Sequence, residues 1–210
     1  MLLQDIPRIT LAEPHYIPGC RYNPTRGHSK KVTADLFEKW WTQLPPTDVT
    51  VFSGGPEQHI DGSRRVSYRY AIYQNGSKLH GGQGSLHPDS HVFNAETIGA
   101  RRSLQQVLKS PELRPGRIYI CIDSTSVTQC LRGNAFQSSQ WAFLGCHGAM
   151  EVYDIKVKWD SGHTGITGNE EADKFEDSEA RNLSTPKGAA QHPTVSGMRT
   201  IARHMLRDVR

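Results

Sequence analysis

Three carboxylates from separate parts of the chain carry the chemistry that this sequence most clearly offers. Glu96 lies in the first turn of a predicted helix, Asp123 directly follows the apolar run RIYICI, and Asp173 ends the string GHTGITGNEEAD. Carboxylates that gather at one place repel one another unless cations neutralise them, so such a group is a candidate site for divalent ions. Each acid taken singly has a plainer interpretation, as a helix cap or a solvated surface residue.

The pattern of apolar residues predicts the elements that must position these acids. Strands are expected over 49–53, 66–74 and 77–86, and Asn75-Gly76 between the last two is a strong hairpin signal. A helix over 93–110, a buried strand over 117–122 and a helix with Asp123 at its cap follow. A helix over 137–152, a strand over 153–159 and a last helix over 169–182 complete the order. The predicted fold is α/β: a five-stranded mixed sheet, three strands antiparallel and then two parallel, flanked by helices.

The positions of proline and glycine predict where the chain divides into an arm, a domain and a tail. Residues 1–31 have little periodicity and are interpreted as an extended N-terminal arm. Residues 32–47 contain the helical pattern VTADLFEKWWTQL and a linker that begins at Pro45-Pro46. The domain itself is expected over 48–183, and 184–210 are interpreted as a tail that could form a short basic helix.

Composition indicates a globular protein of the intracellular class. Hydrophobic residues make up 36% of the 210 residues and charged residues 22%, and the net charge of +4 permits a polyanionic partner without requiring one. No run approaches the roughly 18 apolar residues of a membrane helix, and MLLQDIPR does not fit a signal peptide. Cys20, Cys121, Cys130 and Cys146 show no C-x-x-C spacing, so we expect free thiols rather than a metal or redox site.

Four strings, in a fixed order, resemble one family. They are VTVFSGG, FNAETIGA, ICIDSTSV and GHTGITGNEEAD, and together they span about residues 48 to 180. In this order they resemble the type 1 ribonuclease H domain, particularly the reverse transcriptase-associated domain of fungal non-LTR retrotransposon polyproteins. The last string is the most specific of the four. Transposases and integrases share the general sheet, but the glycine-histidine loop and the acidic last helix favour ribonuclease H.

The resemblance implies hydrolysis of the RNA strand of an RNA–DNA hybrid with two Mg²⁺ ions, for which Mn²⁺ can substitute. It assigns Glu96, Asp123 and Asp173 as metal ligands and catalytic residues, and His163 as a residue that assists proton movement or product release. Hybrid or other double-stranded nucleic acid is the expected partner, contacted near Asn94, Ser124 and Thr125. No membrane partner is expected. The flanks are similar to those of a domain within a larger retroelement polyprotein.

One position departs from the family pattern in a way that bears directly on activity. The family carries an aspartate at the tip of the first strand, where it bridges both metals, but this sequence has Gly54. Asp48 is too far along the strand to replace it, and Glu57 and Asp61 are the remaining candidates. Ser67 and Arg69 also stand where relatives have glycines that leave room beside the site. The resemblance therefore predicts a ribonuclease H whose activity is weakened or lost.

Three functions stay open at this point. The chain could be a ribonuclease H with weak activity or a displaced ligand. It could instead be a nuclease-dead module that still binds nucleic acid, or a protein-interaction scaffold with an exposed apolar patch near Trp40 and Trp41. Gly54 is compatible with a degenerate retroelement copy, with engineered inactivation and with reuse of the domain for binding.

Overall fold

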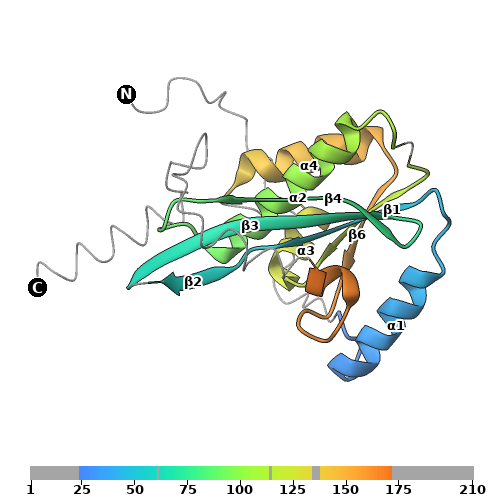
Figure 1. Cartoon of the computed structure of the whole chain (residues 1–210), viewed down its shortest axis with the longest axis horizontal. Coiled ribbons are helices and arrows are strands. Elements are labelled where there is room, and N and C mark those ends of the chain that lie inside the picture. Colours follow the sequence, from blue (N-terminus) through green and yellow to red (C-terminus); the bar gives the residue numbers. More distant parts are fainter. Residues whose placement is uncertain (1–23, 61, 114, 134–137, 172–210) are drawn as a thin grey trace, which may run out of the picture.

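A computed structural model describes residues 24–60, 62–113, 115–133 and 138–171, and its arrangement of helices around a sheet is drawn in Figure 1. The strands are β1 (Val49–Gly54), β2 (Glu57–Ile60), β3 (Ser63–Gln74), β4 (Ser77–Ser85), β5 (Ile118–Ile122) and β6 (Ile155–Trp159). The helices are α1 (Lys30–Thr42), α2 (Val92–Lys109), α3 (Thr125–Arg132) and α4 (Gln140–Val152). None of the helices in these ranges is long and apolar enough to cross a membrane.

The sheet is mixed, as the sequence predicts. Its order is β2-β3-β1-β5-β6, and β4 pairs with β3. β1 pairs antiparallel with β3 and parallel with β5, and β5 pairs parallel with β6. At the predicted hairpin between β3 and β4, Asn75 and Gly76 both have positive φ, as a type I′ turn requires. The expected α/β class with antiparallel and parallel strands is therefore confirmed.

Helices cover both faces of the sheet. On one face, α2, α3 and α4 enclose the larger core, in which Val51, Ile72 and Ile120 are fully buried against α2. On the other face, Phe37 of α1 packs against Phe52 and Cys121. Residues of β1 alternate between the two cores, and all six are buried. The tip of β1 is thus held rigidly between two layers of helices.

The structure adds one strand and corrects the boundaries of several predicted elements. β2 pairs antiparallel with the first residues of β3, and the sequence interpretation did not include this strand. α1 begins at Lys30, two positions before Val32 where the helical pattern was expected to start. The N-cap of α3 is Ser124, whose hydroxyl accepts a hydrogen bond from the Val127 amide, so Asp123 is not the cap. Most of the predicted arm, 1–31, and the whole predicted tail, 184–210, lie outside the described residues.

Candidate active site

The tip of β1 lies between two charged residues, Arg69 of β3 and Asp123 at the end of β5. Gly54 pairs with Arg69 of β3 on one side, and Ser53 pairs with Ile122 of β5 on the other. Asp123 follows Ile122 directly, so it continues β5 beside Gly54. Side chains alternate along a strand, and residues paired across strands share a face. Gly54, Arg69 and Asp123 therefore belong to the face of the sheet that α1 covers.

The first turn of α2 is pressed against this tip, and that contact positions Glu96. The Ser53 hydroxyl donates a hydrogen bond of 2.9 Å to the backbone carbonyl of Glu96. A Cβ on Gly55 would lie 2.8 Å from the Glu96 amide nitrogen and 2.8 Å from the Ala95 Cβ. Only glycine permits so close an approach of backbone to backbone. Gly55 and Ser53 thus explain why the acidic helix turn lies at the end of the first strand.

Glu96 and Asp123, the two predicted metal ligands that lie within the described residues, interact electrostatically. Burial and the neighbouring charge of Asp123 raise the pKa of Glu96 to about 8, and a hydrogen bond from Ser124 opposes the rise. Burial also raises the pKa of Asp123, while the charges of His163, Arg69 and Lys30 oppose it. Near neutral pH Glu96 is mainly protonated, because it is buried beside a second carboxyl group. The expectation that Glu96 and Asp123 converge agrees with this coupling.

The glycine-histidine loop covers the Asp123 carboxyl group. A side chain on Gly162 would collide with the Asp123 carboxylate, so this glycine lets the loop backbone lie directly on the acid. His163 is exposed and has a left-handed φ of 57°. The Trp159 indole donates a hydrogen bond of 2.7 Å to the Asp123 carbonyl, which joins the ends of β5 and β6. The loop therefore holds His163 close enough to Asp123 for its charge to act on that acid.

Arg69 fills the corner beside Gly54. Its side chain is buried, with 6% exposed. A Cβ placed on Gly54 would lie 3.0 Å from the Arg69 Nε. The charge of Arg69 also lowers the pKa of Asp123, which opposes the larger rise caused by burial. A guanidinium cation thus lies where the resemblance implies a carboxylate and its metal ions.

Neither of the acids weighed as a replacement is seen to fill this corner. Glu57 is in β2, and both of its carboxylate oxygens accept hydrogen bonds from Arg64, at 2.9 and 2.7 Å. Asp61 lies outside the described residues. Within those residues, no group of three His, Cys, Asp or Glu side chains could hold a metal ion. Among the described side chains, the corner beside Gly54 therefore offers a guanidinium, and no carboxylate, to the metal ions that the resemblance implies.

The structure places the other predicted site residues unequally. Residues 167–171 are helical, and Asp173 and the rest of the predicted last helix lie outside the described residues. Ser124 is at the site, where it hydrogen-bonds Glu96, and Thr125 is exposed beside it. Asn94 is fully buried and its amide donates to the Ser138 hydroxyl at 3.0 Å, so it fastens α2 to the segment before α4 instead of facing a substrate.

Sequence reasoning missed three residues that shape the site. Ser53 fixes α2, and its position in a strand that alternates between two cores could have indicated that it faces the helix. Trp159 anchors Asp123 through its indole, and Lys30 acts on Asp123 from the start of α1. No local pattern pointed to either, because both contacts join segments distant in sequence.

Comparisons with known proteins find structures and no sequence relatives. No protein-family model matches the sequence, and no curated protein matches it. The native prototype foamy virus protease-reverse transcriptase aligns with a TM-score of 0.50 and 15% identity, over 63% of this chain and 21% of that chain. A foamy viral protease-reverse transcriptase in complex with an RNA/DNA hybrid aligns with a TM-score of 0.51 and 12% identity, over 63% and 20%. RNase H1 from Halobacterium salinarum aligns with a TM-score of 0.47 and 15% identity, over 60% and 92%.

These likenesses concern the fold. The aligned part spans about one fifth of each foamy virus chain, and the identities are too low to carry residue roles across. The agreement lies in the mixed sheet, in which β1 is antiparallel to β3 and parallel to β5, and in the helices on both faces. The described part of the chain therefore has a ribonuclease H-like fold.

Proposed function

We propose that this chain is a ribonuclease H-like module that binds RNA–DNA hybrids or other double-stranded nucleic acid. In this proposal its metal-dependent cleavage of the RNA strand is weakened or lost. The observation that carries the proposal is the buried guanidinium of Arg69 beside Gly54. Together with His163, this cation opposes the rise that burial causes in the pKa of Asp123, and in a working two-metal site Mg²⁺ or Mn²⁺ would act on the acid in this way.

The foamy virus complex is the support for nucleic acid as the partner. The aligned structure contains an RNA/DNA hybrid, and it belongs to a protease-reverse transcriptase. We extend this to propose that the chain comes from the reverse transcriptase-associated part of a retroelement polyprotein. The strings ICIDSTSV and GHTGITGNEEAD support the same origin, because they match the family pattern in sequence order.

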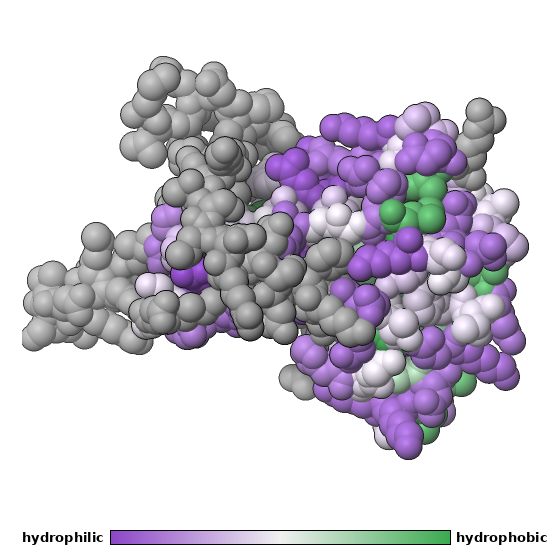
Figure 2. All heavy atoms as spheres, in the orientation of Figure 1, coloured by the Kyte–Doolittle hydropathy of each residue, from purple (hydrophilic) through white to green (hydrophobic). Residues whose placement is uncertain are grey.

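The protein-interaction alternative predicts an exposed apolar patch near Trp40 and Trp41. Trp40 and Trp41 are partly buried against the smaller core, and the Trp41 indole donates a hydrogen bond of 2.9 Å to Thr50. They therefore do not form an exposed apolar patch on α1. On the face drawn in Figure 2, hydrophobic residues appear as small separate groups among hydrophilic ones.

Restoring the acid and removing the arginine together tests the proposal. Four proteins are compared on a labelled RNA–DNA hybrid with Mg²⁺ or Mn²⁺: the parent, Gly54→Asp, Arg69→Ala and the double variant. In Gly54→Asp, the new carboxylate would pair with Arg69, so the guanidinium would still compete with the metal ions. We expect the double variant to cleave at least about tenfold faster than either single variant, because one charge-stabilising group is commonly worth a factor of 10² to 10³.

Three controls make the result specific to this site. Asp123→Asn in the double-variant background should abolish the restored cleavage, which excludes a contaminating nuclease. Double-stranded DNA should stay intact, and Arg102→Ala, an exposed charge on α2, should leave the rates unchanged. Cleavage by the parent as fast as by the double variant would refute the impairment, and failure of the parent to bind a hybrid would refute the binding function.

A further inference from the structure

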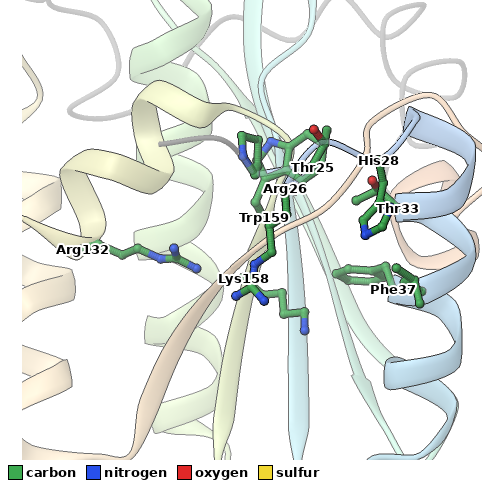
Figure 3. Close-up of a pocket in the computed structure, with 10 residues that line it drawn as sticks. Thr25, Arg26, His28, Thr33, Phe37, Arg132, Lys158 and Trp159 are labelled. Atoms are coloured by element: carbon green, nitrogen blue, oxygen red, sulfur yellow. The ribbon is translucent and has the colours of Figure 1, made fainter. Parts of the chain in front are cut away.

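A second site lies on the α1 face of the molecule. It is a cavity of about 310 Å³ between the segment that precedes α1, α1 itself, the end of α3 and the end of β6. Figure 3 shows Arg132 from α3, Lys158 from β6, and Arg26 and His28 from residues 24–28 around this space. Phe37 of α1 forms part of its wall.

The charges of this cavity are of one sign. Arg26, His28, Arg132 and Lys158 line it, and none of the described residues that line it is acidic. Burial lowers the pKa of Lys158, and the charges of Arg26 and Arg132 lower it further. Cations that gather in one cavity without a carboxylate in its lining repel one another, so an anion that enters relieves this repulsion.

Two of the three cations have a contact that holds the side chain in place. The Arg132 guanidinium donates a hydrogen bond of 2.8 Å to the Val157 carbonyl. The Lys158 ammonium lies 3.9 Å from the centroid of the Trp40 ring, which is cation–π geometry. Arg26 is exposed and sits in a turn closed by a hydrogen bond of 3.0 Å from the His28 amide to the Thr25 carbonyl. Because the Arg132 and Lys158 side chains are already ordered, an anion would bind with a smaller loss of entropy.

The cavity adjoins the candidate active site. Trp159 lines the cavity and also donates to the Asp123 carbonyl at 2.7 Å. Lys158 pairs with Cys121 across the sheet, so its side chain lies on the same face as Gly54 and Asp123. A polynucleotide strand held at the acids could therefore extend along this face to the cavity.

We propose that this cavity binds phosphate groups of the nucleic-acid backbone and so extends the binding surface beyond the candidate active site. This inference rests on the proposed function. The proposed ligand of the cavity is the phosphodiester backbone of a duplex. The cavity is built partly from α1 and residues 24–28, which precede the region of the family resemblance. Phosphate contacts of this kind fix the position of a duplex and carry no sequence preference.

The test measures affinity for a fluorescent RNA–DNA hybrid as a function of salt, in EDTA so that no cleavage occurs. The variant Arg26→Gln/Arg132→Gln removes two exposed cations of the cavity and leaves the core intact. The matched control Arg102→Gln/Lys109→Gln removes two exposed cations of α2, which lies on the opposite face. We expect the cavity variant to bind about tenfold more weakly at moderate salt. The slope of log K against log salt should fall by about 1 to 2, and the control should be unchanged.

Each other outcome overturns the inference in a recognisable way. If the parent binds and both variants match it in affinity and salt slope, the cavity does not contact the hybrid, and the proposed function stands. If the parent fails to bind a hybrid at all, the proposed function and this inference fall together. A parallel titration with pyrophosphate shows whether the cavity binds free anions when the hybrid does not reach it. Loss of pyrophosphate binding in the cavity variant, with hybrid binding unchanged, would show a site for free anions and refute the backbone role.

Discussion

At the scale of single residues, the site is governed by how buried charges are compensated. A carboxylate in low dielectric must be protonated, hydrogen-bonded or paired with a cation. Glu96 is 8% exposed and remains protonated near neutral pH because its pKa is about 8. Burial also raises the pKa of Asp123, but the charges of His163, Arg69 and Lys30 oppose that rise. The two neighbouring acids thus share the effect of burial and differ in the groups that face them, a carboxyl group for Glu96 and cationic groups for Asp123.

The state of Glu96 predicts a pH dependence of stability. Its folded pKa, about 8, is above the model-compound value of 4.5, so the folded state binds the extra proton between these two values. The free energy of unfolding of the parent should therefore fall, relative to that of Glu96→Gln, as pH rises from 4.5 to 8. The total change should be on the order of a few kcal/mol, with no further change below pH 4.

Chemical denaturation of both proteins in EDTA across this pH range measures the difference. Glu151→Gln is the matched control, because it removes an exposed carboxylate at the end of α4. A constant difference between the parent and Glu96→Gln from pH 4.5 to 8 would contradict the buried, protonated state of Glu96.

At the scale of the elements, α1 is part of the fold and not an appendage. Phe37 is 4% exposed, and its ring lies 5.1 Å from the Trp40 centroid and 6.0 Å from the Phe52 centroid. Phe52 is in β1, so α1 packs on the strand that carries Gly54 at its tip. Phe37→Ala should lower the free energy of unfolding by about 3 to 5 kcal/mol, because it leaves a cavity in this core.

Leu36 provides the comparison on the same helix. It is 52% exposed, so Leu36→Ala should change the free energy of unfolding by less than about 0.5 kcal/mol. Urea denaturation of the two variants, monitored by circular dichroism, tests the prediction. Equal losses for the two substitutions would mean that α1 does not dock through Phe37.

Local sequence patterns predicted which helices and strands are present better than they predicted where these elements end or what their side chains contact. Asn75-Gly76 predicted the hairpin, since residues that tolerate positive φ are needed there. β2 was missed because it has only four residues, and a proline precedes it. The family resemblance suggested a substrate contact near Asn94. Its side chain instead points to Ser138, a partner 44 positions away that no local spacing reveals.

In the candidate site too, local patterns predicted some residues, and contacts between distant segments were missed. Glu96 and Asp123 were predicted from strand ends and a helix turn, and the structure couples them. Arg69 was seen only as a residue in place of a glycine. That its guanidinium fills the corner beside Gly54 depends on the register between β1 and β3, which the sequence does not encode in any short pattern.

At the scale of the whole molecule, strands differ in how many neighbours secure them. β1 and β5 each have a strand on both sides and helices on both faces, and every residue of β1 is buried. β2 has four residues and pairs only with β3. The tip that carries Gly54 therefore belongs to the most constrained part of the sheet, and the strand that follows it belongs to the least constrained.

Amide hydrogen exchange followed by mass spectrometry should reveal this gradient. Amides of β1 and β5 can exchange only when the sheet opens as a whole, so their protection should approach the global free energy of unfolding. Amides of β2 can exchange when that edge strand separates from β3, so they should exchange at least about 100-fold faster. Peptides that cover α2 serve as an internal reference, because this helix packs on the larger core. Similar protection in β2 and β1 would mean that the edge strand opens only with the core, and that the site is constrained from both sides of Gly54.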